Sequence, residues 1–292
     1  MILNVSGRTD IVAFYMPWFM NRIKEGYFDV RNPFNRKLVS RIFMEDVDAI
    51  IFCTKNPRPL VEHLDEIQLP IVVQVTLTSY TSDIEPNVPD KKKTIEYIKK
   101  ISERIGKENV MVRYDPILLN EKYDIDYHIR AFDKLCEKLE SKVETIIISF
   151  LDEYQNVKRN AGTLKHRKFE DADYEKIGLS FSVSAKRHGL VVQTCHEKND
   201  LSQFGFAKSA CVSHELAYKL TGKPFKDWKA RKCGCVEMVD IGAYNTCSHF
   251  CKYCYANYDE AKVVSNRTLH DEFSSMLIGH IEDGDVIKRR TK

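Results

Sequence analysis

Short apolar runs rich in β-branched residues alternate with amphipathic stretches between residues 2 and 195, and this alternation constrains the fold more than any other feature. Strands that are apolar on both faces and alternate with helices are typical of a parallel sheet covered on both sides. The predicted strands span residues 2–6, 49–53, 71–77, 110–114, 145–150 and 190–195, and the predicted helices span residues 12–25, 58–67, 90–105, 124–141 and 172–188.

The number of these strand–helix units favours a complete or partial TIM-like (β/α) barrel over an open doubly wound sheet, which is the main alternative. A chain of 292 residues, 43% of them hydrophobic, can bury a core of that size. Asp90 and Asp124 stand where helix N-caps are expected. Gly26, Gly106 and Gly189 follow predicted helices, where a residue with a left-handed backbone often ends a helix.

Polar and charged residues follow all six predicted strands, in segments 6–10, 54–57, 78–80, 113–116, 151–154 and 195–198. Any one of these segments could be an ordinary turn. Parallel α/β proteins, however, collect their active-site loops at the C-terminal ends of the strands, so the six together predict a site for an ionic small molecule. The candidate substrate-binding or catalytic residues are Arg8, Asp10, Lys55, Arg113, Asp115, Asp152, Glu153, His196 and Glu197.

Individual roles at this predicted site follow from side-chain chemistry. Arg8 or Arg113 could bind a carboxylate through two parallel hydrogen bonds, and Lys55 could act as a point charge. Asp115 or Glu153 could accept hydrogen bonds from ribose hydroxyls.

Three cysteines are crowded into the stretch "YNTCSHFCKYCYAN", where Cys247, Cys251 and Cys254 have the spacing C-x3-C-x2-C. Three thiolates are one short of a closed four-ligand zinc site, but they can hold three irons of a [4Fe–4S] cluster. The fourth iron is then open to an amine and a carboxylate from outside the protein. The alternatives are a zinc site completed by a distant ligand, and a cluster that serves only structure or electron transfer. We exclude His249 from the ligands.

The remaining cysteines divide into two groups. Cys195, Cys211, Cys233 and Cys235 lie in the same C-terminal half of the chain and could bind a second [4Fe–4S] cluster or a zinc ion. The alternative for Cys195 and Cys211 is burial as small apolar residues, which is also the prediction for Cys53 and Cys136.

Composition and charge narrow the setting. The net charge of +3 and the absence of an arginine-rich stretch argue against a nucleic-acid partner. The segment "MILNVSGRTD" lacks the features of a signal peptide, and no run of about eighteen apolar residues predicts a membrane span, so we expect a cytoplasmic protein with reduced thiols. The basic run at residues 90–93 is interpreted as the solvated start of a helix.

The segment "CSHFCKYC" resembles the CxxxCxφC signature of radical S-adenosylmethionine (SAM) enzymes, with Tyr253 at the aromatic position. In those enzymes the motif normally follows the first strand, whereas here it lies near residue 250. With "SGRTDI", "TKNP", "RYDPI", "FLDEY" and "CGC…DIGAYNTCSHFCKYCYAN", the chain resembles over nearly its whole length DUF1848, a bacterial and archaeal family with no settled reaction. The resemblance implies that a barrel-like domain, residues 1–225, and a C-terminal iron–sulfur region, residues 226–292, form one unit.

The same resemblance implies a chemistry. Cys247, Cys251 and Cys254 would bind a [4Fe–4S] cluster whose open iron binds the amine and carboxylate of SAM. A ferredoxin or flavodoxin would supply an electron, and the radical released from SAM would take hydrogen from a small polar substrate. Tyr253, Asp240 and Gly242 are the predicted cofactor-binding residues. The alternatives are a non-radical group transfer from SAM, nucleic-acid modification or repair, and an iron–sulfur or zinc protein without catalysis.

Overall fold

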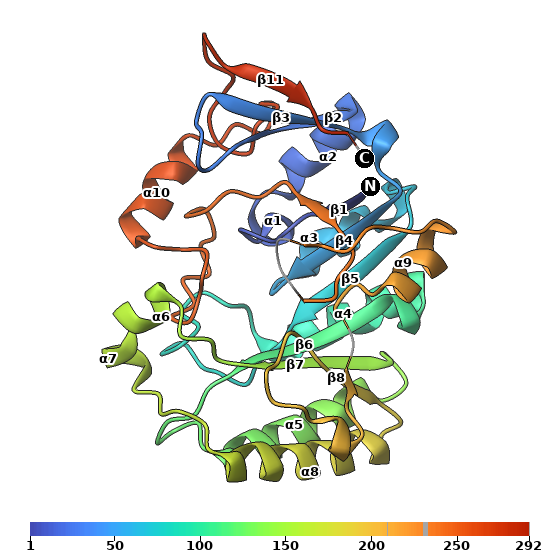
Figure 1. Ribbon diagram of the computed structural model, residues 1–292, viewed down its shortest axis with the longest axis vertical. Coiled ribbons are helices and arrows are strands. Elements are labelled where there is room, and N and C mark those ends of the chain that lie inside the picture. The colour runs from blue at the N-terminus through green and yellow to red at the C-terminus, as the bar shows by residue number, and fades with distance from the viewer. Residues whose placement is uncertain (209, 230–232, 292) are drawn as a thin grey trace.

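The largest element of the computed structural model, which describes residues 1–208, 210–229 and 233–291, is an eight-stranded parallel sheet. Its order is β10-β1-β4-β5-β6-β7-β8-β9, so the first strand lies beside the last (Figure 1). The strands are β1 (Ile2–Asn4), β4 (Ala49–Thr54), β5 (Ile71–Thr76), β6 (Val110–Ile117), β7 (Thr145–Phe150), β8 (Val191–Thr194), β9 (Ala207–Lys208) and β10 (Met238–Asp240).

Alternate residues of each strand enter two different cores, because successive side chains point to opposite faces of a sheet. On β4, Ile50 and Phe52 belong to the main core beneath the helices. Their neighbours Ala49 and Ile51 belong to a second core on the other face, which residues after β9 complete. The sheet is therefore buried on both faces, which accounts for its nearly continuous apolar strands.

The long helices cover the outer face of the sheet. Figure 1 shows α5 and α8 side by side along β6, β7 and β8, and Phe132 of α5 stacks on Phe181 of α8 with ring centroids 3.8 Å apart. The α-helices are α1 (Ile11–Phe14), α2 (Met16–Glu25), α3 (Arg58–His63), α4 (Lys91–Ile105), α5 (Ile125–Leu139), α6 (Gln155–Arg159), α7 (Ala161–Leu164), α8 (Asp171–Arg187), α9 (His214–Thr221) and α10 (Glu260–Thr268). Short 3-10 turns are η1 (Met44–Asp46), η2 (Leu64–Glu66), η3 (Lys107–Asn109) and η4 (Ser202–Phe204).

A smaller sheet that was not predicted joins the two ends of the chain. It has the order β11-β3-β2, in which β2 (Tyr27–Arg31) is antiparallel and β11 (Val286–Arg289) is parallel to β3 (Leu38–Phe43). Charged residues inside these strands interrupt the alternation of apolar and polar residues that would identify them in the sequence. Asp29 of β2 and Arg41 of β3 are two such residues, and they pair with each other at 2.7 Å.

The six predicted strands and five predicted helical stretches are confirmed, with one internal correction. Residues 12–25 do not form one helix, because Tyr15 (φ −138°, ψ 24°) separates α1 from α2. Pro17 stands in the first turn of α2, where its missing N–H costs nothing. The side chains of Asp90 and Asp124 cap α4 and α5 as predicted.

The predicted parallel α/β class is confirmed, while closure of the sheet into a barrel stays a prediction. Among the described residues, no strand pairing connects β9 to β10. Strand β10 lies in the main sheet, so the region after residue 225 contributes to the same layer as β1. The division at residue 225 also stays a prediction. No helix in the described part of the chain combines the length and the apolar character needed to cross a bilayer.

Acidification from pH 7 to pH 5 is expected to lower the free energy of unfolding through His128. Burial lowers the pKa of this imidazole from 6.5 to about 4, and its ring nitrogens contact the Tyr114 hydroxyl (2.8 Å) and the Leu118 carbonyl (2.9 Å). Below pH 6.5 the unfolded chain binds a proton that the folded chain does not, so stability falls until about pH 4. The loss at pH 5 is about 2 kcal/mol. Urea unfolding at both pH values measures it, and a His128→Gln variant with the same pH dependence would contradict the assignment.

Candidate functional site

The segment 244–258, named the cysteine loop from here on, joins β10 to α10 and lies against the loops at the C-terminal ends of the strands. Lys252 N donates to Ile84 O (2.9 Å) in the loop after β5, and the Asn156 amide of α6 donates to Tyr255 O (3.0 Å). Figure 1 shows this segment in orange, passing from β10 towards α6. The cysteine loop and the predicted polar loops thus share one end of the sheet.

Turns within the cysteine loop bring its three cysteines together. Phe250 has a left-handed backbone (φ 53°), and Cys254 N donates to Cys251 O at 3.0 Å. Burial raises the pKa of Cys247 well above its usual range and that of Cys251 to about 12. The pKa of Cys247 is raised further by Asp10 and by the charges of Cys254 and Cys251, so the three sulfurs lie in one electrostatic neighbourhood.

Beneath the cysteine loop, a buried carboxylate connects two lysines to the motif tyrosine. Glu85 accepts hydrogen bonds from Lys55 Nζ (2.7 Å), Lys91 Nζ and the Tyr253 hydroxyl. Burial opposes ionisation of Glu85, but Lys55 and Lys91 outweigh it and lower its pKa well below the usual range. Both lysines also stabilise a thiolate at Cys251. Lys55 Nζ lies 5.5 Å from the centroid of the Tyr253 ring.

Glu85 and Lys91 were not identified from the sequence. Glu85 lies in a loop with no motif, and its only sequence signal is its place five residues after a predicted polar segment. Asp90, Lys92 and Lys93 are exposed at the start of the helix, as predicted, but the partly buried Lys91 pairs with Glu85, whose side chain is 1% exposed.

Asp10 connects three of the loops at this end of the sheet. Its Oδ1 caps α1 through Ala13 N (3.0 Å), while its Oδ2 accepts from Lys55 N (2.8 Å) and contacts His249 Nε2 (3.0 Å). The other ring nitrogen of His249 lies 3.1 Å from Asn87 O, so the imidazole is held within the protein rather than directed at a ligand. Asp10 is therefore a buried residue that holds the start of α1, the loop after β4 and the cysteine loop together.

Arg8 and Asp240, predicted as separate substrate and cofactor residues, pair with each other. Arg8 Nε donates to Asp240 Oδ1 at 3.0 Å, and Gly242 N donates to the same oxygen at 2.7 Å. Asp240 Oδ2 is buried and has no hydrogen-bond partner among the described residues. The roles of Arg8, Asp240 and Gly242 towards a ligand stay predictions.

Substitution of Gly7 by alanine is expected to destabilise this end of the sheet by about 1 to 3 kcal/mol. A Cβ at Gly7 would lie 1.7 Å from Asp240 Oδ2, and the Arg8 pair keeps that carboxylate from moving aside. Thermal unfolding measures the loss. The matched control is Gly162→Ala in α7, where nothing lies within 4 Å of the new Cβ and the helix gains propensity. Equal melting temperatures for the two variants would contradict the crowding at Gly7.

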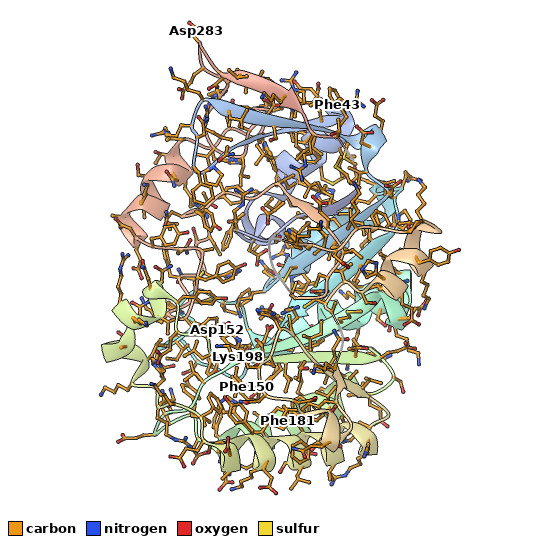
Figure 2. The ribbon with its side chains drawn as sticks, viewed as in Figure 1. Phe43, Phe150, Asp152, Phe181, Lys198 and Asp283 are labelled. Carbon is orange, nitrogen blue, oxygen red and sulfur yellow. The ribbon has the colours of Figure 1, made fainter. Side chains whose placement is uncertain are left out.

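A second group of predicted residues lies at the ends of β6, β7 and β8. Arg113 donates to Asp115 Oδ2 (2.5 Å) and to the Gln74 side chain (3.0 Å). Burial, together with the charges of Asp152 and Asp115, raises the pKa of Glu197 to about 7. The carboxylates of these three residues therefore lie close enough to affect one another electrostatically, as the convergence of strand ends predicts. Figure 2 labels Asp152 and Lys198 at this end of β7.

Three of the predicted residues are less enclosed. Asp152, Glu153 and His196 are exposed, and Glu153 lies 3.7 Å from His166 Nε2. His196 has a left-handed backbone (φ 54°).

Cys53 lies between the two groups, because its pKa, raised by burial to about 11, also responds to Arg113, Asp115 and Asp10. Cys136 is fully buried in the main core, as its predicted packing role requires.

The second set of predicted cysteine ligands also meets in the folded chain. Cys211 is in hydrogen-bonding contact with the thiols of Cys195 and Cys235, and Cys235 is in contact with Cys233. Within the ranges that the structure describes, no group of three or more His, Cys, Asp or Glu side chains has an arrangement that could hold a metal ion.

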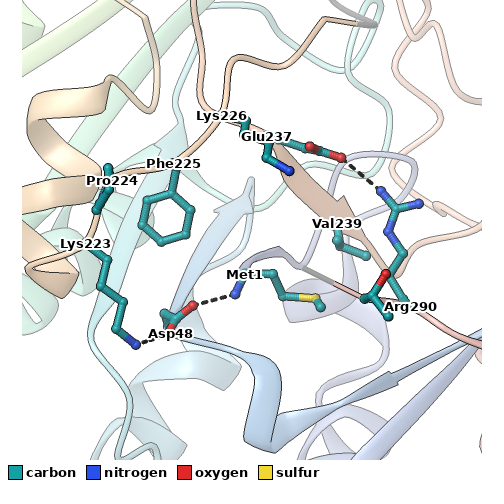
Figure 3. Close-up of a pocket in the computed structure, with 10 residues that line it drawn as sticks. Met1, Asp48, Lys223, Pro224, Phe225, Lys226, Glu237, Val239 and Arg290 are labelled. Atoms are coloured by element: carbon teal, nitrogen blue, oxygen red, sulfur yellow. Dashed lines mark hydrogen bonds and ion pairs between the residues drawn. The ribbon is translucent and has the colours of Figure 1, made fainter.

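A surface pocket of about 200 Å³ lies at the other end of the sheet (Figure 3). It is lined by Met1 and Asp48, which precede β1 and β4, and by Lys223, Glu237 and Arg290. Two of its cations have acidic partners: Lys223 lies 2.5 Å from Asp48, and Arg290 lies 2.9 Å from Glu237. The pocket is therefore separate from the polar loops and offers no unpaired charge among these residues.

Comparison with known proteins adds one firm result. No curated protein matches the chain. A solved endoglucanase structure is 12% identical, with 76% of this chain and 96% of that chain covered, and its TM-score of 0.24 is too low to support an argument about fold or function. The model of a family described as a domain of unknown function, DUF1848, matches residues 2–256, and the chain belongs to this family.

Proposed function

We propose that this protein is a SAM-dependent [4Fe–4S] enzyme of the radical SAM type that acts on a small polar substrate. The observation that carries the proposal is the three-cysteine loop, which packs against the polar loops at the C-terminal ends of a parallel sheet. This is the end at which α/β proteins bind substrates. A barrel closed between β9 and β10 is part of the proposal.

The chemistry of the residues suits such a group, but their side chains would have to turn towards a common centre, because no group of described residues is arranged to hold a metal ion. Thiolates are soft ligands that favour iron–sulfur chemistry, and three of them on one loop leave one iron of a cubane cluster without a protein ligand. Cys247, Cys251 and Cys254 would hold the cluster. Lys55 and Lys91 provide positive charge for the anionic sulfurs. The unpartnered Asp240 Oδ2 is a hydrogen-bond acceptor available to a ligand amine at the adjacent strand ends.

When bound, a cluster and SAM supply one-electron chemistry at a carbon–hydrogen bond, and the chain's residues position the reactants and exclude water. Glu85 fixes Tyr253 and Lys55 beside Cys251. Asp10 holds the cysteine loop through His249. Asp115, Glu197 and Asp152 offer a substrate hydrogen-bond acceptors, and the buried Arg113 holds Asp115 in place.

Anaerobic reconstitution with iron and sulfide tests the proposal. We expect about four irons per chain at the cysteine loop, counted as the difference between the unaltered protein and Cys251→Ala. Cys136→Ala is the matched control, because Cys136 lies in the main core and should leave the iron content unchanged. With a chemical or ferredoxin reductant, the reconstituted protein should convert SAM to 5′-deoxyadenosine.

Two outcomes would overturn the proposal. One is equal iron content in the unaltered protein and Cys251→Ala, with zinc as the only metal at the loop. The other is a cluster that neither binds nor cleaves SAM, which would favour electron transfer or a structural role. Formation of an aminocarboxypropyl product in place of 5′-deoxyadenosine would indicate non-radical group transfer.

A further inference from the structure

Four cysteines from three separate segments come into contact, and three of them, Cys211, Cys233 and Cys235, belong to the second core on the face of the sheet opposite the long helices. Cys195 follows β8, Cys211 follows β9, and Cys233 and Cys235 precede β10. Their thiols form a continuous chain of contacts, Cys195–Cys211–Cys235–Cys233. Cys195 and Cys211 are 16 residues apart in sequence, and Cys211 and Cys233 are 22 apart, so the fold is needed to bring these sulfurs together.

Hydrogen bonds to the backbone hold the sulfur-bearing segments in place. Gln74 of β5 donates through Nε2 to Cys211 O at 2.9 Å. Val236 N donates to Val212 O at 3.1 Å, which ties the residue after Cys211 to the residue after Cys235. Cys235 is 4% exposed, so at least this thiol is closed off from solvent.

The turn between Cys233 and Cys235 is suited to presenting two thiols from one short segment. Gly234 has a φ of +72°, a backbone conformation that side chains other than glycine rarely adopt. The opposing segment is close on this side, because a Cβ at Gly234 would lie 3.9 Å from the Cβ of Ala210.

A cation lies against this sulfur group. The Arg113 guanidinium is in hydrogen-bonding contact with Cys211, and its charge also acts on Cys195. Cysteines that are buried only as apolar residues need no such partner. A guanidinium beside Cys211 would instead stabilise sulfurs that carry negative charge.

We propose that Cys195, Cys211, Cys233 and Cys235 form a second thiolate centre that binds a soft metal, either as a zinc ion or as an iron–sulfur cluster. Four thiolates around a divalent ion carry a net charge of about −2, part of which Arg113 neutralises. Binding releases the remaining thiol protons and replaces the sulfur–sulfur contacts by metal–sulfur bonds. The thiols must turn from their present chain of contacts towards a common centre.

The centre is separate from the proposed SAM site, and its test must not depend on that site. The starting protein is therefore Cys247→Ala/Cys251→Ala/Cys254→Ala, the triple variant, purified without oxygen. It is supplied with zinc alone in one arm and with iron and sulfide in the other. We expect it to retain either about one zinc or a cluster of about four irons per chain. Analysis of acid-labile sulfide distinguishes an iron–sulfur cluster from a zinc ion.

Addition of Cys211→Ala and Cys235→Ala to the triple variant should remove that metal. Cys53→Ala added instead is the matched control, since Cys53 is outside the chain of sulfur contacts. Circular dichroism verifies that each variant is folded. If the five-cysteine variant does not fold, Co²⁺ titration of the triple variant replaces it: thiolate-to-cobalt absorption at one equivalent supports the centre, and its absence overturns it.

A triple variant that is folded yet retains neither metal would overturn the second centre, whatever the cysteine loop binds. Conversely, the variant Cys211→Ala/Cys235→Ala with the cysteine loop intact reports only on the first site. Loss of all iron from that variant, with metal kept in the triple variant, would contradict the proposed function and leave the second centre standing.

Discussion

Replacement of Glu85 by alanine is expected to lower the free energy of unfolding by about 3 to 5 kcal/mol, because it leaves buried cations without their carboxylate. The Glu85 side chain is 1% exposed, and Lys55, one of its two lysine partners, is 12% exposed. The substitution also removes the acceptor of the Tyr253 hydroxyl, so the cysteine loop should loosen. Urea unfolding measures the stability, and amide hydrogen exchange measures opening of the loop.

Glu62→Ala is the control for this substitution. Glu62 pairs with Arg58 through side chains that are 59% and 65% exposed, and solvent-exposed pairs contribute about 0 to 1 kcal/mol. A second variant, Glu85→Ala with Lys55→Met, should recover part of the loss, because it removes one of the two stranded cations. If Glu85→Ala and Glu62→Ala destabilise the protein equally, the buried network does not hold the loop.

Phe181→Ala should destabilise the protein by about 3 to 5 kcal/mol through the cavity it creates between α5 and α8. Phe181 and Phe132 are both fully buried, and their rings stack at an interplanar angle of 3°. Neighbouring helices cannot fill a space of this size without moving from the sheet. Thermal or urea unfolding gives the magnitude.

The control for this cavity is Phe34→Ala, since Phe34 is 96% exposed and its removal should change stability by less than about 0.5 kcal/mol. Phe181→Leu should lie between the two, because leucine fills part of the space. A loss below 1 kcal/mol for Phe181→Ala would mean that α5 and α8 do not pack through this ring pair.

Local sequence patterns were sufficient to predict the core of the fold. The strand at 145–150 and the helix at 124–141 are marked by apolar periodicity, and Asp124 marks the helix start through a local hydrogen bond. These features depend on residues a few positions apart, so they are visible in one sequence. Strands β2 and β3 were missed because the Asp29–Arg41 pair inside them breaks the apolar alternation.

The site could be predicted only in part, because most of its contacts join distant segments. Local spacing identified Cys247, Cys251 and Cys254, and strand ends identified Asp10 and Lys55. No local pattern connects Glu85 to Tyr253 or Arg8 to Asp240, since these partners are more than 160 residues apart. Such pairings depend on the order of strands in the sheet, in particular the position of β10 beside β1.

The adjacency of β10 and β1 has a consequence for biosynthesis. Strand β1 is the first strand of the main sheet to be translated, but β10, its partner on the side away from β4, is the last. The cysteine loop emerges later still, after the strands against which it rests. Any metal that the loop receives is therefore inserted after the strands of the main sheet have been translated, and a nascent chain interrupted before residue 238 would carry β1 paired only with β4.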